Sequence, residues 1–123
     1  MTTKAAAIHQ FLSSMGIPAY PSTSVPDDAS MPYLTYSLAV GAWDDGETNI
    51  PVDLWYRTES EAEPNAKVEE ISRKVGLGGT QLACDGGSVW IKRGSPFAQS
   101  VQDEDNSVKR RLVNLSAEYN TLI

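Results

Sequence analysis

The sequence predicts an α+β domain in which two helices pack on a mainly antiparallel β-sheet, in the order α-β-β-α-β-β-β-β. Three observations lead to this prediction: two segments with helical spacing of apolar residues, several segments in which apolar and polar residues alternate, and glycine-containing turns between them. A chain of 123 residues is close to the commonest domain size, so we expect residues 1–123 to form a single domain.

The first predicted helix covers residues 3–15, with Thr2 or Thr3 as its N-cap and Gly16 at its end. Its apolar residues recur at helical spacing and are Ala5, Ile8, Phe11, Leu12 and Met15. Residues 17–32 contain several prolines, which predicts an extended loop.

The second predicted helix lies within residues 58–75. The residues that form its buried stripe are Val68, Ile71 and Val75. Its start has two interpretations, because Ser60 and Glu63 match a capping box, whereas Pro64 favours a later start near Glu63.

The predicted strands are the segments in which side chains alternate. Residues 33–40 and 50–57 form the first pair, and residues 81–93 form a hairpin around a turn at residues 85–88. Residues 95–123 form a final hairpin with an acidic tip at residues 103–106 and a returning strand at residues 108–119. That strand is longer than a small sheet requires, so the outer half of the hairpin, residues 102–111, is expected to form a charged inter-subunit or lumen-facing arm, with a purely solvated turn as the alternative. Its inner half is expected to pack in the core through Val113, Leu115, Ala117 and Tyr119.

The charge of the chain limits the functions that it can have. A formal net charge of −6 argues against a nucleic-acid-binding protein, because cationic side chains supply most of the affinity for phosphates.

No apolar run approaches the ~18 residues of a membrane span, and residues 1–9 lack the apolar stretch of a signal peptide. A single cysteine, Cys84, fits a reducing compartment. We therefore expect a soluble protein that does not associate with membranes.

The residues that usually carry catalysis are scarce. His9 is the only histidine and reads as a solvated helix residue, and Cys84 reads as a small apolar strand residue. One histidine and one cysteine exclude a histidine–cysteine zinc cluster. The acidic runs at residues 44–47 and 103–105 lack the ligand spacing of a calcium loop. We predict no catalytic residue, no metal site and no cofactor, so the protein is not expected to be an enzyme.

The tryptophans allow two interpretations. Trp43 lies in a predicted loop, and Trp55 and Trp90 lie on the strand faces opposite the aliphatic residues. Large aromatic residues outside the core often anchor contacts between proteins. Alternatively, if the two helices cover both faces of the sheet, these residues belong to the core.

Three segments and the order of the elements together resemble a known family. The segments are the end of the first helix at Gly16-Ile17-Pro18, the strand-to-helix passage over residues 50–71, and the final strand over residues 109–119. In these features nearly the whole chain resembles the tail terminator proteins of long-tailed bacteriophages, also called tail completion or tail-to-head joining proteins. The proline-rich segment 18–32 departs from that pattern.

The resemblance implies a structural viral protein of the virion, assembled in the host cytoplasm and located at the head–tail interface. Such proteins form a ring, typically a hexamer, that closes the tail tube and takes part in head–tail joining and virion assembly. The implied partners are other copies of the chain, the major tail tube protein and a head-completion protein, while DNA passes through the lumen without specific binding. The candidate inter-subunit or lumen residues are Trp43, Asp44, Asp45, Asp103, Glu104, Asp105, Arg110 and Arg111.

Other functions remain open at this point. A different head–tail connector or neck component would share the size and ring symmetry. A small cytosolic enzyme or ligand-binding protein would require an acidic pocket, for example around Asp53 or Asp85. A monomeric adaptor would use the exposed tryptophans to bind a host protein.

Overall fold

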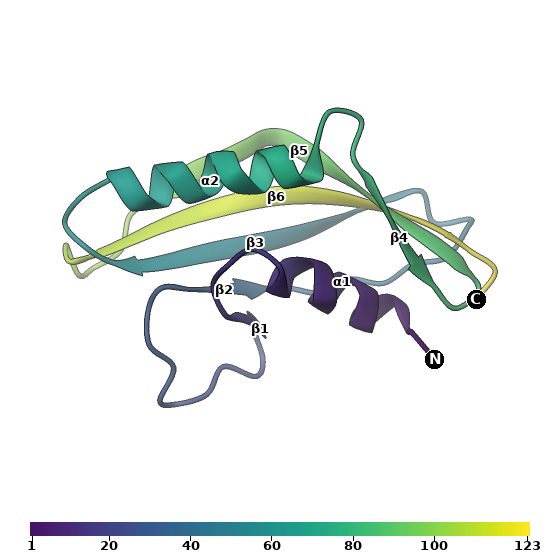
Figure 1. Ribbon diagram of the computed structural model, residues 1–123, viewed down its shortest axis with the longest axis horizontal. Coiled ribbons are helices and arrows are strands. Elements are labelled where there is room, and N and C mark those ends of the chain that lie inside the picture. The colour runs from purple at the N-terminus through teal and green to yellow at the C-terminus, as the bar shows by residue number, and fades with distance from the viewer.

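The computed structural model describes residues 1–123 as two helices and a six-stranded sheet, an α+β fold (Figure 1). The elements in chain order are α1 (Lys4–Ser13), β1 (Ala19–Pro21), β2 (Tyr33–Tyr36), β3 (Glu47–Arg57), α2 (Ala62–Val75), β4 (Thr80–Cys84), β5 (Gly87–Val101) and β6 (Val108–Thr121). No helix is long and apolar enough to cross a membrane.

The sheet is mixed, with the strand order β1-β2-β3-β6-β5-β4. β1 and β2 pair in parallel, and every other neighbouring pair is antiparallel. The predicted order of elements is wrong in two places. β1 precedes the first predicted strand. It was not predicted, because its three residues lie among prolines and show no alternation of apolar and polar side chains.

The second error concerns β5, which was expected to be two strands. Gly94 and Pro96 suggest a break, yet the chain continues in the sheet across a bulge between Arg93 and Ala98. At this bulge the side-chain amide of Asn114 on β6 donates a hydrogen bond to the Pro96 carbonyl at 3.0 Å. The irregular segment is therefore tied to its neighbour, and the long strand is not interrupted.

β2 ends earlier than the alternation of residues 33–40 predicts, and Pro51 on β3 explains why. The Ser37 amide donates to the Pro51 carbonyl at 3.1 Å, but proline has no N–H with which to return the bond. The ladder between β2 and β3 stops at this point. Leu38 and Val40, which fall within the predicted strand 33–40, lie outside the sheet and are exposed as a result.

The ends of the helices follow local chemistry. The Thr3 hydroxyl accepts a hydrogen bond from the Ala6 amide at 3.0 Å, which confirms one of the two predicted caps of α1. α2 begins at Ala62, and the capping box predicted from Ser60 is not formed, because its hydroxyl accepts from the Ala62 amide instead.

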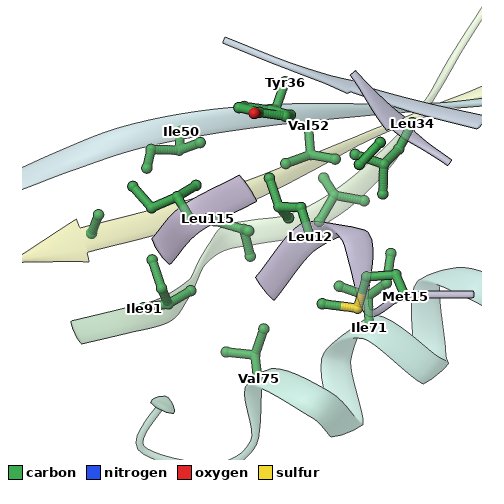
Figure 2. Close-up of a cluster of buried hydrophobic side chains, with 14 of the residues drawn as sticks. Leu12, Met15, Leu34, Tyr36, Ile50, Val52, Ile71, Val75, Ile91 and Leu115 are labelled. Atoms are coloured by element: carbon green, nitrogen blue, oxygen red, sulfur yellow. The ribbon is translucent and has the colours of Figure 1, made fainter. Parts of the chain in front are cut away.

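Both helices lie on the same face of the sheet, which we call the inner face. The Lys67 ammonium of α2 donates to the Met15 carbonyl, which follows α1, at 2.8 Å. Side chains from both helices and from five strands meet in one apolar cluster. Figure 2 draws part of this cluster. The cluster includes the inner residues of β6, so their predicted burial is confirmed: Val113, Leu115, Ala117 and Tyr119.

β6 lies in the middle of the sheet, between β3 and β5. It pairs with β3 from Val108 to Glu118, so the outer half of the terminal hairpin does not project as an arm. The expectation that this strand exceeds the needs of its own sheet is therefore wrong. Only the tip of the hairpin, at residues 102–107, extends beyond the sheet.

Candidate assembly surfaces

The face of the sheet opposite the helices, which we call the outer face, carries a row of half-buried aromatic side chains. The rings of Tyr20 on β1 and Tyr33 on β2 meet edge to face with their centres 5.7 Å apart. The Tyr33 ring lies 6.4 Å from that of Trp55 on β3. Because no helix covers this face, the row contributes a surface rather than a second core.

Arg110 on β6 extends the row by one strand. Its guanidinium carbon lies 4.6 Å from the centre of the Trp55 ring, and its Nε donates to Asp53 Oδ1 at 3.1 Å. The Trp55 indole N–H donates to the Thr35 hydroxyl at 3.0 Å. These contacts hold the Trp55 and Arg110 side chains in place, so this part of the row is a preorganised surface.

A second group of charges lies on the outer face near the other end of the strands. Lys92 on β5 forms ion pairs with Glu47 on β3 and, at 3.9 Å, with Glu118 on β6. Its ammonium also lies 4.2 Å from the centre of the Trp90 ring. These contacts hold two like-charged carboxylates side by side across the ladder. The expectation that Trp55 and Trp90 face away from the main core agrees with this arrangement.

The loop with Trp43, Asp44 and Asp45 lies at one end of the sheet. The Trp43 side chain is 69% exposed, while its backbone N–H donates to the Thr121 carbonyl at 3.0 Å. Asp45 accepts from the Ala42 amide at 3.0 Å, which makes a local turn. The backbone is therefore fixed while the indole ring faces solvent.

The acidic tip with Asp103, Glu104 and Asp105 lies at the opposite end (Figure 1). Asp105 accepts hydrogen bonds from the Ser107 hydroxyl at 2.7 Å and the Ser107 amide at 2.9 Å. These bonds, with a weaker contribution from Arg57, hold the pKa of Asp105 below its usual value. The two predicted loops therefore do not form one surface, because the length of β3 separates them.

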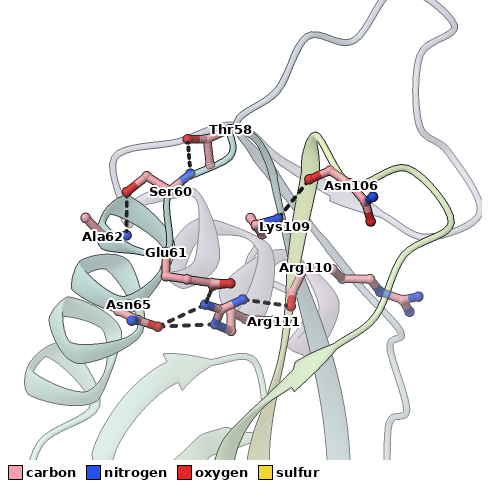
Figure 3. Close-up of polar contacts among 9 residues, drawn as sticks. All are labelled: Thr58, Ser60, Glu61, Ala62, Asn65, Asn106, Lys109, Arg110 and Arg111. Carbon is pink, nitrogen blue, oxygen red and sulfur yellow. Dashed lines mark hydrogen bonds and ion pairs between the residues drawn. The ribbon is translucent and has the colours of Figure 1, made fainter.

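Arg110 and Arg111 point to opposite sides of β6, as Figure 3 shows. The guanidinium of Arg111 is on the inner face, where it forms an ion pair with Glu61 and donates to Asn65 Oδ1 at 3.0 Å. Arg111 is only 5% exposed, and its hydrogen bond lowers the pKa of Glu61. Arg111 therefore links the start of α2 to β6 within the subunit.

His9 and Cys84, the two residues considered for catalysis, make contacts that fit structural roles. His9 Nδ1 lies 2.9 Å from the Tyr36 hydroxyl, and its Nε2 lies 3.3 Å from the Ser13 hydroxyl. Burial raises the pKa of the Cys84 thiol, which disfavours the nucleophilic thiolate. No group of three or more His, Cys, Asp or Glu side chains is placed to hold a metal ion.

The sequence placed Trp55 on the strand face opposite the aliphatic residues but did not identify its neighbours in the aromatic row. Tyr20 and Tyr33 of the aromatic row and Lys92 beside Trp90 were missed, and Asp53 was considered only for an acidic pocket and not as the partner of Arg110. Alternation along β2, β3 and β5 could have assigned the faces of Tyr33, Asp53 and Lys92, whereas Tyr20 lies on a strand without alternation. The pairing of Trp55 with Arg110 depends on the register between strands distant in sequence.

No protein-family model and no curated protein sequence matches this chain. Among solved structures, the fold is similar to that of a chain in the virion of a native gene transfer agent (GTA) particle. The TM-score is 0.65 with 18% sequence identity, and the similarity covers 94% of this chain and 92% of the other. At this level of identity the comparison establishes a shared fold over nearly the full length of both chains.

Proposed function

We propose that this protein is a non-enzymatic structural component of a phage-like virion, where it forms a ring that closes the tail tube and joins the tail to the head. The observation that carries the proposal is the likeness to a virion chain over 94% of this chain and 92% of the other. The two folds agree over nearly the full length of both chains and not only over a shared core motif. This supports a similar position in a particle.

The surfaces of the subunit support an assembly role. The outer face is uncovered and preorganised, and one loop at each end of the long strands exposes acidic side chains. A subunit with different surfaces on its ends and faces suits a heterologous contact, in which one surface meets a different surface of the next copy. Such contacts close into a ring when the rotation between neighbouring copies permits. We assign assembly contacts to Trp43, Asp44, Asp45, Asp103, Glu104, Asp105 and Arg110, whereas Arg111 acts within the subunit.

The acidic charge of the chain suits a passage for DNA. With a net charge of −6 per subunit, a ring lumen would repel phosphates, and DNA would pass without specific binding. The partners on this proposal are other copies of the chain, the tail tube protein and a head-completion protein.

Deletion of the gene from the phage-like element that encodes the protein tests this function. The expected result is tails of irregular, excessive length together with separate, filled heads, visible by electron microscopy. Expression of the intact gene in trans should restore joined particles. Tails of normal length beside unjoined heads would instead indicate a head-completion role, and normal particles would contradict a role in the virion.

A further inference from the structure

One groove of the molecule differs from the others in charge. It has a volume of about 450 Å³ and lies between α1 and the edge strand β4. Its walls include Ala7 and Phe11 of α1 and Leu82 and Ala83 of β4, and none of its lining residues is charged. Each of the other three grooves is lined by both acidic and basic side chains.

The two edges of the sheet differ in how they are protected. β1 has only three residues and ends at Pro21, and both features discourage the addition of another strand. β4 has five residues, Thr-Gln-Leu-Ala-Cys, without a proline or a charged side chain. An edge of this kind is a template on which another extended chain can form backbone hydrogen bonds.

The chain also contains a segment that fits such an edge. Residues 38–40 continue the strand-like alternation of β2 but leave the sheet at Pro51, and their amides make no backbone hydrogen bond. Leu38 is 42% exposed and Val40 is 50% exposed. Three consecutive amides without a protein partner, beside two exposed apolar side chains, form an incomplete strand.

The groove and the segment cannot meet within one subunit. The Ala39 carbonyl accepts a hydrogen bond from the hydroxyl of Tyr119, near the end of β6, which fixes residues 38–40 beside that central strand. β5 lies between β6 and β4 in the strand order. The occupant of the groove must therefore come from another molecule.

We propose that residues 38–40 add as a strand to the free edge of β4 in a second copy of this chain, with Leu38 and Val40 seated in the groove. Both surfaces are uncharged, so the contact brings no like charges together even though each copy has a net charge of −6. Leu38 and Val40 are two residues apart, so on a strand both point to the same side, toward Phe11 and Leu82.

This contact is heterologous, because two different surfaces meet: the copy that donates residues 38–40 keeps its groove free, and the copy that supplies the groove keeps its own residues 38–40 free. It therefore repeats from copy to copy until a ring closes. The inference rests on the proposed assembly of several copies and adds the identity of the interface.

Cross-linking of two different cysteine variants tests the geometry. Val40→Cys and Ala83→Cys, each combined with Cys84→Ser, are purified separately and treated with a short bis-maleimide alone or as a mixture. The expected result is a covalent dimer only in the mixture. Leu77→Cys with Cys84→Ser is the matched control, because Leu77 is 96% exposed on a loop outside the groove, and its mixture with the Ala83→Cys protein should give no dimer.

Charge substitutions test the energetics by sedimentation. Val40→Asp and Ala83→Lys should each weaken self-association at least tenfold, whereas Leu77→Asp should leave it unchanged. If the wild-type protein self-associates but the mixture gives no cross-link, or neither substitution weakens association, the interface is wrong and the proposed function stands. If the wild-type protein stays monomeric at every concentration and the mixture gives no cross-link, both the interface and the ring are contradicted.

Discussion

Arg110 covers the ring of Trp55 on the outer face while its Nε is hydrogen-bonded to Asp53. Register places Trp55 and Arg110 directly opposite each other on β3 and β6. Aromatic and cationic side chains in this position couple two neighbouring strands, and they do so on a face that contributes nothing to the main core.

A double-mutant cycle should measure this coupling. Trp55→Leu and Arg110→Met together should destabilise the protein by less than the sum of the single changes, with a coupling of about 0.5–1 kcal/mol in urea unfolding. The control pair is Trp55→Leu with Arg57→Met, because Arg57 pairs with Asp105 at the tip. Additive effects in the Arg110 cycle would show that the contact does not stabilise the fold.

Tyr119 should make stability sensitive to alkaline pH. Burial raises its pKa to about 12, from a usual value of 10.0. The unfolded state therefore loses the phenolic proton first, so the free energy of unfolding should fall as pH rises from about 10 toward 12, by about 1.4 kcal/mol per pH unit. Tyr119→Phe should show a shallower decline in urea unfolding between pH 9 and 11. The same slope in both proteins would contradict a buried, protonated Tyr119.

Glu61 should make the stability of the fold sensitive to acidic pH. The hydrogen bond from Arg111 lowers the pKa of Glu61 below its usual value of 4.5. A carboxyl group with a lowered pKa stabilises the fold above its unfolded pKa, and this contribution is lost as pH falls through the folded pKa. Glu61→Gln should therefore lower the melting temperature at pH 7 but not at pH 2.5.

Glu63→Gln provides the matched control for this change, because Glu63 lies in the first turn of α2, two residues after Glu61, and forms no ion pair. At pH 7 Glu61→Gln should lower the melting temperature more than Glu63→Gln, because only Glu61 has an ion-pair partner to lose. An equal effect of Glu61→Gln at both pH values would mean that the ionised carboxylate is not what stabilises this contact.

The acidic tip should be dispensable for folding. Replacement of Asp103, Glu104 and Asp105 by alanine removes the bonds to Ser107 and Arg57 but leaves the ladder from Val108 onward intact. Circular dichroism should be unchanged, and hydrogen exchange should become faster only at residues 103–107. A loss of folding would assign the tip a structural role.

Local patterns predicted much of this fold. The alternation in β6 identified its four central inner residues, and helical spacing identified Ile71 and Val75 as core residues. The same alternation assigns Arg111 to the inner face, next to Val113. Its partner Glu61 could not be inferred, because that contact joins residues 50 positions apart in the sequence.

The candidate surfaces were harder to predict than the core. A loop such as that of Trp43 is recognisable from turn residues, but its position relative to the tip depends on strand register. The early end of β2 depends on Pro51, whose missing N–H acts on a strand that precedes it by more than ten residues. Interactions of this kind are set by tertiary pairing and leave no periodic signal in the sequence.

The place of β6 between β3 and β5 has a consequence for the order in which the molecule can fold. β6 is the last of the six strands to leave the ribosome, yet it is the strand that joins β1-β2-β3 to β5-β4. Until it is synthesised, the long strands β3 and β5 each keep an open edge. We therefore expect nascent chains that lack residues 108–121 to be the species most prone to aggregation and most dependent on chaperones.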